Sequence, residues 1–191
     1  MMIFQLRTLA LGFVAVFILS STATARRGFH PTSSPSTSTG SSSFPQLLLA
    51  HHNAKRALHS APKLSWNHTL AHYAAAHASN CVYAHSQGPY GENLSAGAPY
   101  SSMSAKKLFN GWYAEGDDYN YSTNSFSEDD GHFTQIVWKS TKQLGCAVAS
   151  CDASQLGMSA SGKGMYLVCE YYPPGNVQGE YVKKVQPPKS S

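Results

Sequence analysis

Four cysteines constrain the fold of this chain more than any other feature of its sequence. In an oxidising compartment, an even number of cysteines in a small domain is typical of a disulfide framework. A zinc cage is the weaker alternative, because the sequence holds no C-x-x-C pair. Four cysteines allow three pairings, and the residues alone do not choose between them. The cysteines are Cys81, Cys146, Cys151 and Cys169.

The N-terminal residues 1–25 have the three parts of a secretory signal peptide. Arg7 provides a short positive region, the stretch from Leu9 to Leu19 is apolar, and Ala23-Thr24-Ala25 fits a small-residue cleavage site. The apolar stretch is shorter than the ~20 residues that cross a membrane. We therefore expect a secreted, extracellular protein that contacts membranes transiently at most and whose mature form starts near Arg26.

Residues 26–45 consist almost entirely of Ser, Thr, Pro and Gly, and such a composition buries too little apolar surface to order a chain. We interpret this range as a flexible leader and a candidate for O-glycosylation. Arg26-Arg27 within it is either a processing site or a chance dibasic pair. The rest of the chain predicts one globular domain over residues 46–187 and a tail over residues 188–191.

Charge and motifs exclude several functions. The net charge is +4 and the basic residues are scattered, which excludes a nucleic-acid partner. The sequence has no G-x-S-x-G, H-E-x-x-H, P-loop or dinucleotide-binding motif. Cysteines that form disulfides leave no thiol nucleophile. These observations favour a binding protein over an enzyme.

Three stretches show the helical spacing of apolar residues. The first runs from Gln46 to Pro62, the second starts at Asn67 as N-cap, and the third follows Ser102 or Ser104 and ends at Gly116. The apolar positions are Leu47, Ala50, Ala54, Ala57 and Leu58 in the first, Leu70, Ala71, Ala74, Ala75 and Ala78 in the second, and Ala105, Leu108, Phe109, Trp112 and Tyr113 in the third.

A carboxylate lies on the apolar face of the third predicted helix. Glu115 follows Trp112 by three residues and Leu108 by seven, which is the spacing of one helix face. A buried carboxylate needs a partner, so we expect a hydrogen-bonding group close to Glu115.

Two runs in the second half of the chain predict strands. Residues 144–150 and 165–172 are rich in Val, Leu and Tyr with little polar alternation, which is typical of strands covered on both faces. Helices before and between such strands predict an α+β fold with three layers, an α-β-α sandwich with the sheet in the middle.

Three short segments combine an ionisable residue with aromatics and glycine. They are AHSQGPYGENL (84–94), WYAEG (112–116) and GHFTQIVW (131–138). Together with LAHHNAKR (49–56), LGC (144–146) and YLVCEYYPPGN (166–176), they resemble the CAP superfamily of cysteine-rich secretory, allergen and pathogenesis-related proteins. GHFTQIVWKST and the GEYVKKVQP ending resemble its fungal branch, the pathogen-related yeast proteins, more than the plant defence proteins.

The resemblance implies an α-β-α sandwich with a mainly antiparallel sheet and a central cleft. It implies disulfides from Cys81 to Cys151 and from Cys146 to Cys169. An extra cysteine pair of the plant members, placed just before the GH motif, is missing, so we expect the loop over 122–131 to be freer. The cleft residues that carry over from the family are His85, Glu92, Glu115 and His132.

The role of this tetrad stays open at the level of the sequence. It is a structural cluster in which each Glu orients a His, a divalent-cation site for Zn²⁺ or Mg²⁺ without catalysis, or the centre of a metal-dependent hydrolase. Catalysis is the least favoured of the three, because metal sites of hydrolases usually supply a third protein ligand.

The fungal branch also implies sterol binding, at a loop with three spaced aromatic residues. Tyr119, Tyr121 and Phe126 fit this pattern in YNYSTNSF. Flat aromatic rings can cover a rigid apolar polycycle while tyrosine hydroxyls reach its polar end, and such binding requires no cofactor. We therefore expect a secreted protein that binds and exports or sequesters sterols.

Other ligands and roles stay as alternatives. Fatty acids would use a separate apolar groove between helices. A defence or virulence interaction role is a further alternative, although the segment after Pro174-Gly175-Asn176 lacks the Pro-Tyr ending of the plant peptide. The acidic run Glu128-Asp129-Asp130 is interpreted as a solvated loop rather than a cation site.

Three sequons and a group of histidines complete the candidates. Asn67 and Asn120 are predicted glycosylation sites, whereas Asn93 lies beside Glu92 and is expected to be enclosed. Six histidines on the first two helices are expected to be solvated or at the edge of the core: His51, His52, His59, His68, His72 and His77.

Overall fold

The computed structural model describes residues 43–189. The predicted signal peptide lies outside the described residues, as do all but the last three positions of the predicted leader and the last two positions of the predicted tail. The domain boundaries predicted from the sequence therefore stay predictions.

The described chain folds around a four-stranded sheet in the order β1-β3-β4-β2. Strand β1 (Ser65–Trp66) is parallel to β3 (Gln143–Asp152), and β3 pairs antiparallel with β4 (Lys163–Tyr172). Strand β2 (Gly91–Gly97) is antiparallel to β4 on its other side. The central strand β4 is buried from Gly164 to Tyr171, as its largely apolar pattern predicts.

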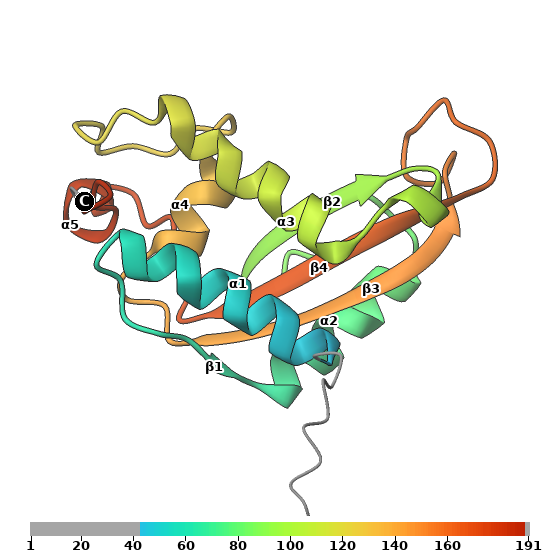
Figure 1. The fold of residues 1–191 in the computed structure, drawn as a ribbon, viewed down its shortest axis with the longest axis horizontal. Coiled ribbons are helices and arrows are strands. Elements are labelled where there is room, and N and C mark those ends of the chain that lie inside the picture. The colour runs from blue at the N-terminus through green and yellow to red at the C-terminus, as the bar shows by residue number, and fades with distance from the viewer. Residues whose placement is uncertain (1–42, 190–191) are drawn as a thin grey trace, which may run out of the picture. The chain divides into compact units, whose positions relative to one another are not determined.

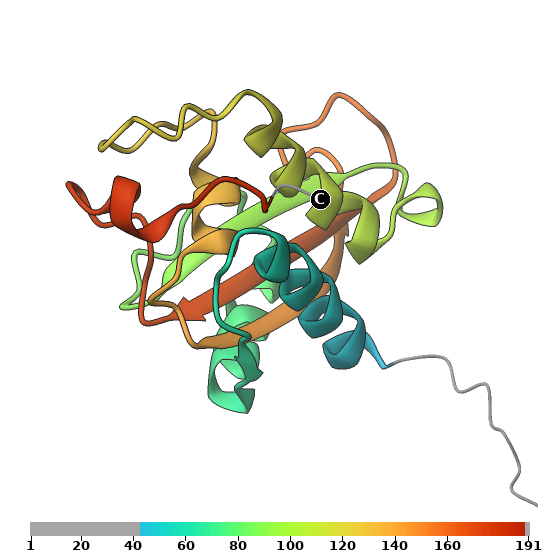
Figure 2. The same cartoon turned by 60° about the vertical axis from the view of Figure 1, so that its left-hand side comes forward.

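Helices cover both faces of this sheet (Figure 1). Helix α2 (His68–Ser79) packs on β3 and β4 from one side. On the other side α1 (Phe44–Leu58), α3 (Ala105–Ala114) and α4 (Gly131–Val137) pack against one another (Figure 2). The predicted three-layer α-β-α sandwich is confirmed. Short elements complete the fold: the 3₁₀ turns η1 (Tyr100–Ser102) and η2 (Glu115–Asp118), and α5 (Tyr181–Lys184).

The two disulfides have the pairing that the resemblance implies; one links two strands of the sheet and the other links the end of α2 to the sheet. Cys146 of β3 and Cys169 of β4 are cross-strand partners, and their sulfur atoms are 2.05 Å apart. Cys81 follows α2 and is bonded to Cys151 of β3, with a sulfur separation of 2.08 Å. No described cysteine is free.

Helix α1 differs from its prediction in start and in orientation. It begins at Phe44 rather than Gln46, because the backbone N–H of Ser43 donates to Oε1 of Gln46, 3.1 Å away, in a capping arrangement. The predicted apolar face was wrong: the alanines at 50, 54 and 57 are exposed. The buried face carries Leu48, His52 and Arg56.

Polar side chains can occupy this buried face because each of their nitrogen atoms has a hydrogen-bond partner. The guanidinium of Arg56 donates to four carbonyl oxygens at 2.8–2.9 Å, those of Pro62, Ile136, Trp138 and Thr141. The ring nitrogens of His52 lie 2.8 Å from the Leu48 carbonyl and 2.9 Å from the Tyr171 hydroxyl. Arg56 thus ties α1 to the end of α4 and to the turns beside it.

Candidate functional site

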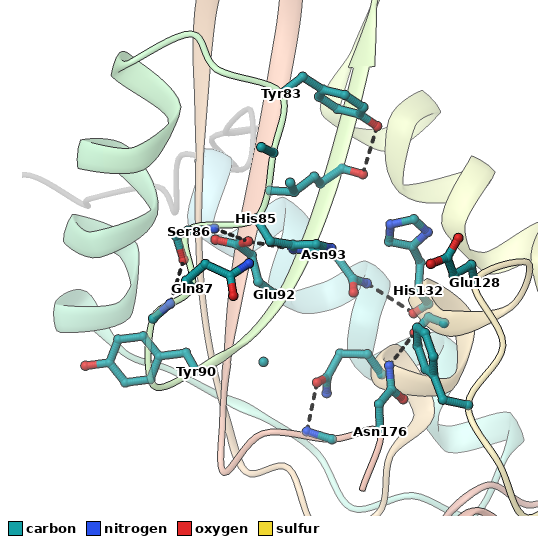
Figure 3. Close-up of a pocket in the computed structure, with 18 residues that line it drawn as sticks. Tyr83, His85, Ser86, Gln87, Tyr90, Glu92, Asn93, Glu128, His132 and Asn176 are labelled. Atoms are coloured by element: carbon teal, nitrogen blue, oxygen red, sulfur yellow. Dashed lines mark hydrogen bonds and ion pairs between the residues drawn. The ribbon is translucent and has the colours of Figure 1, made fainter. Parts of the chain in front are cut away.

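A cleft of about 670 Å³ opens between the 83–94 segment and the N-terminal part of α4. Figure 3 shows His85 and Glu92 on one side of it, His132 on the other, and Asn93 between them. The Asn93 side chain donates to the carbonyl oxygen of His132 at 3.1 Å and so links the two sides. Gln87, Tyr90 and Asn176 also line the cleft.

The first side of the cleft carries a His–Glu pair. Nδ1 of His85 lies 2.7 Å from Oε1 of Glu92, which also accepts the backbone N–H of Ser86 at 2.9 Å. The hydrogen bond to Glu92 raises the pKa of His85. Burial alone would raise the pKa of Glu92, but the hydrogen bonds from His85 and Ser86 lower it to about 2. Glu92 is therefore a carboxylate that orients His85.

The second side has the same arrangement. Nδ1 of His132 lies 2.7 Å from Oε1 of Glu115, while Oε2 of Glu115 accepts the backbone N–H groups of His132 and Phe133 at 3.1 and 3.2 Å. The predicted partner of Glu115 is thus the first turn of α4. Its predicted location needs correction, because α3 ends at Ala114 and Glu115 begins η2 instead of lying within the helix.

These contacts decide which atoms remain for a ligand. Both Nδ1 atoms are bonded to a glutamate, so only Nε2 of His85 and Nε2 of His132 are left for a metal ion. Within residues 43–189, no group of three or more His, Cys, Asp or Glu side chains is placed so that it could hold a metal ion. The tetrad therefore fits two imidazole ligands with two orienting carboxylates, and it does not fit four protein ligands.

A further carboxyl group near the cleft was missed by the sequence interpretation. Glu170 of β4 is completely buried and is the cross-strand partner of Glu92. No donor among the described residues bonds to either of its oxygens or to Oε2 of Glu92. Burial, together with its contact with Glu92, raises the pKa of Glu170 to about 9. Burial and the neighbouring Glu92 carboxylate therefore favour the neutral form of Glu170 near pH 7.

This raised pKa predicts a pH dependence of stability. The pKa of Glu170 is 4.5 in the unfolded chain and about 9 in the folded protein. Its contribution to stability is therefore fully present below pH 4.5 and is lost as the pH rises toward 9. Glu170→Gln should therefore flatten the fall in unfolding free energy between these pH values, which is at most about 1.4 kcal/mol per pH unit. Chemical denaturation from pH 5 to 9 measures it.

The matched control for that experiment is Glu180→Gln, because Glu180 pairs with Lys184 at the surface. Equal pH profiles for wild type and Glu170→Gln would show that Glu170 ionises freely in the folded protein.

The three predicted sterol-binding residues lie on the segment 119–130, between η2 and α4, but they do not share one face. Tyr119 is only 6% exposed, with its ring 4.9 Å from that of Tyr121 and 5.4 Å from that of Phe133. Tyr121 is half-buried, whereas Phe126 is 50% exposed and lines the cleft. We expected three exposed rings, but only Phe126 and part of Tyr121 are accessible. The ring of Tyr119 is buried because it packs against Phe133.

The sequon asparagines and the histidines of the first two helices differ in how deeply they are buried. Asn93 is 1% exposed, whereas Asn120 is exposed. The Asn67 side chain caps α2 and donates to Gln143 at 2.8 Å, so its amide is engaged in the folded protein. His52 and His59 are fully buried, so their predicted exposure was wrong; His59 is held by the Gln186 carbonyl and the Tyr113 hydroxyl.

The fold, the disulfides and the two His–Glu pairs define a class of protein. Comparison with known proteins identifies that class. The chain belongs to the cysteine-rich secretory protein family, the CAP family, whose model matches residues 49–171.

Fungal proteins are among its similar relatives. "Repressed by EFG1 protein 1" of Candida albicans is 41% identical over 152 residues, which cover 76% of this chain and 52% of the relative. "Protein PRY2" of Saccharomyces cerevisiae is 41% identical over 149 residues, which cover 75% of this chain and 41% of the relative. "Secreted protein RBT4" of Candida albicans is 41% identical over 144 residues, with 71% and 36% covered. The chain thus spans about half or less of these relatives, and none of the three names is that of an enzyme.

Solved structures show the same fold. The structure described as NaASP2 with Zn²⁺ has a TM-score of 0.59 and 25% identity, with 76% of this chain and 86% of that chain covered. Schistosoma mansoni venom allergen-like protein 4 has a TM-score of 0.59 and 23% identity, with 78% and 97% covered. Within residues 43–189 of this protein, no helix has the length and apolar character needed to cross a membrane.

Proposed function

We propose that this protein is a secreted, non-catalytic binding protein that takes up a sterol at the segment 119–130. The observation that carries the proposal is the half-exposed ring of Phe126 at the edge of the cleft, on a segment without helix or strand. The resemblance to the fungal branch supports it, because sterol binding is implied there for this loop. Export or sequestration of the sterol is the role that follows, and a fatty-acid groove and a defence role remain predictions.

The contacts of the segment suit reversible opening. Two hydrogen bonds connect the centre of this segment to the loop over residues 176–180. The backbone N–H of Gly179 donates to the Asn124 carbonyl, and the backbone N–H of Phe126 donates to Oε1 of Gln178, both at 3.2 Å. Each hydrogen bond contributes about 1 kcal/mol to stability. Burial of the apolar surface of a sterol contributes ~25 cal/mol per Å², which in total exceeds the loss of both bonds. We expect Phe126 and Tyr121 to contact the ligand first, and Tyr119 to do so as the segment moves outward.

Replacing Tyr121 and Phe126 together by serine should weaken binding of a radiolabelled sterol at least tenfold, because both accessible rings are removed. Tyr119 is kept, since loss of a buried ring costs about 3–5 kcal/mol of stability and would confuse loss of binding with unfolding. Saturation binding to the purified protein measures the effect.

The control is Tyr100→Ser, which removes an exposed aromatic ring from η1. Sterol affinity of the double variant equal to that of wild type, with an unchanged melting temperature, would rule out this loop as the binding site.

A second candidate function is the binding of a zinc ion between His85 and His132. Their Nε2 atoms are the remaining donors, and two imidazoles suit Zn²⁺ better than Mg²⁺, which prefers oxygen ligands. The similar protein solved with Zn²⁺ supports this candidate. A bound zinc ion would supply a Lewis acid with open positions, while Glu92 and Glu115 keep the two rings in the required tautomer.

Replacing both histidines by alanine should abolish stoichiometric zinc in equilibrium dialysis and leave sterol affinity unchanged. Phe126 lines the same cleft, but the sterol contacts the rings of the segment 119–130 and not the two imidazoles. Zinc competes with protons for His85, whose pKa is raised by the hydrogen bond to Glu92, so wild-type zinc affinity should fall as the pH drops and the ring takes up a proton. His72→Ala on the exposed side of α2 is the control. Zinc retained by the double variant, or sterol lost with it, would contradict this assignment.

A further inference from the structure

A second cavity, of about 480 Å³, lies at the C-terminal part of α2. It shares only Ser86 with the cleft that holds the two His–Glu pairs. Its other lining residues are Tyr73, Ala76, His77, Ser79 and Asn80. These six residues include no Lys, Arg, Asp or Glu, so the cavity offers hydroxyl, amide and imidazole groups but no opposite charge for an ionised ligand.

The polar groups of this cavity both donate and accept hydrogen bonds. The Ser79 hydroxyl donates to the Ala76 carbonyl at 2.8 Å, which leaves its oxygen as an acceptor. The exposed side chain of Asn80 adds two N–H donors and a carbonyl acceptor. Nε2 of His77 lies 2.8 Å from the Ala84 carbonyl, so this ring is held in place beside them. Such a mixed set suits ligand hydroxyl groups, which also donate and accept.

Three tyrosine rings continue from the cavity along the surface, and we call them the tyrosine row. The ring centroid of Tyr90 lies 5.1 Å from that of Tyr73 and 6.3 Å from that of Tyr172, both in edge-to-face contact. Tyr172 is 49% exposed, and the other two rings are partly exposed. Figure 3 shows the Tyr90 ring on the α2 side of its segment, pointing away from His132.

The fold fixes the tyrosine row from three separate elements. Tyr73 belongs to α2, Tyr90 directly precedes β2, and Tyr172 is the last residue of β4. A Cβ atom on Gly88 would lie 2.1 Å from Oη of Tyr73, so the backbone of Gly88 packs directly against this hydroxyl. Rings that are already positioned lose little conformational entropy when a ligand binds.

A sugar chain matches both the cavity and the tyrosine row. A pyranose ring carries C–H groups on its faces, which can pack on aromatic rings, and hydroxyl groups around its edge. A fully apolar ligand would leave the polar groups of the cavity unpaired. We infer that the cavity and the tyrosine row form a binding site for a neutral oligosaccharide. The site uses no residue of the segment 119–130, so it is independent of the proposed sterol binding.

The test is isothermal titration of the purified protein with linear hexasaccharides of glucose, of mannose and of N-acetylglucosamine. Wild type should bind at least one of them with saturation, and its affinity should be the same at low and high salt because no charge takes part. Tyr172→Ser removes an exposed ring and Asn80→Ala an exposed amide. Each should weaken binding about fivefold and leave the melting temperature unchanged.

The matched control is Tyr100→Ser, which removes an exposed ring from η1, outside the tyrosine row, and should bind as wild type does. Failure of all three hexasaccharides to bind, or wild-type affinity in either Tyr172→Ser or Asn80→Ala, would overturn the inference. Saturable binding of a polyproline peptide but of none of the sugars would assign the tyrosine row to a peptide and overturn it as well.

Discussion

Arg56→Met should lower the free energy of unfolding by about 3–5 kcal/mol, the largest loss that we expect from a single side chain. The guanidinium is completely buried and donates four hydrogen bonds to carbonyl oxygens. Methionine has a similar length but no donor, so it would leave those carbonyls unsatisfied in the interior.

Urea denaturation of both proteins measures this difference, with Lys107→Met on the exposed surface of α3 as the control for loss of a positive charge. A loss below 1 kcal/mol would mean that water or backbone movement replaces the guanidinium easily. In that case Arg56 would not be what ties α1 to the turns after α4.

Gly145→Ala is expected to cost about 3 kcal/mol, because β3 and α2 approach each other too closely for a side chain at this position. A Cβ atom on Gly145 would lie 2.1 Å from the backbone nitrogen of Ala71 and 2.5 Å from the carbonyl carbon of Leu70. Both are backbone atoms of α2, so relief requires a shift of the whole helix.

The same substitution elsewhere provides a sharp comparison. Gly111 lies inside α3 and a Cβ there would meet no atom within 4 Å, so Gly111→Ala should stabilise the protein by about 0.5–1 kcal/mol. Thermal melting of the two variants should therefore move in opposite directions. A wild-type melting temperature for Gly145→Ala would show that α2 is free to move away from the sheet.

The sequence predicted those parts of the fold in which burial follows apolar periodicity. Leu108, Phe109 and Trp112 are buried on α3 as their spacing indicates, and Asn67 caps α2 with its side-chain oxygen. The mainly antiparallel sheet and the pairing of the cysteines followed from the motifs that resemble the family, whereas the strands β1 and β2 and the strand order were not predicted.

Other features could not be predicted, because they depend on contacts between distant segments. Arg56 and His52 look like a polar helix surface until the carbonyls and the Tyr171 hydroxyl that satisfy them are in place. Glu170 interrupts an apolar strand with a carboxyl whose pKa is raised by burial and by Glu92 across the sheet. The inward turn of Tyr119 follows from its packing with Phe133, which belongs to another motif.

The measurement that tests the account most directly is covalent labelling with a sterol that carries a photoreactive diazirine on its ring system. After irradiation and proteolysis, mass spectrometry locates the label. We predict that it falls on residues 119–130, and that excess unlabelled sterol removes it. Competed label on the His85 side of the cleft or on α2, with none on 119–130, would contradict the proposed binding site.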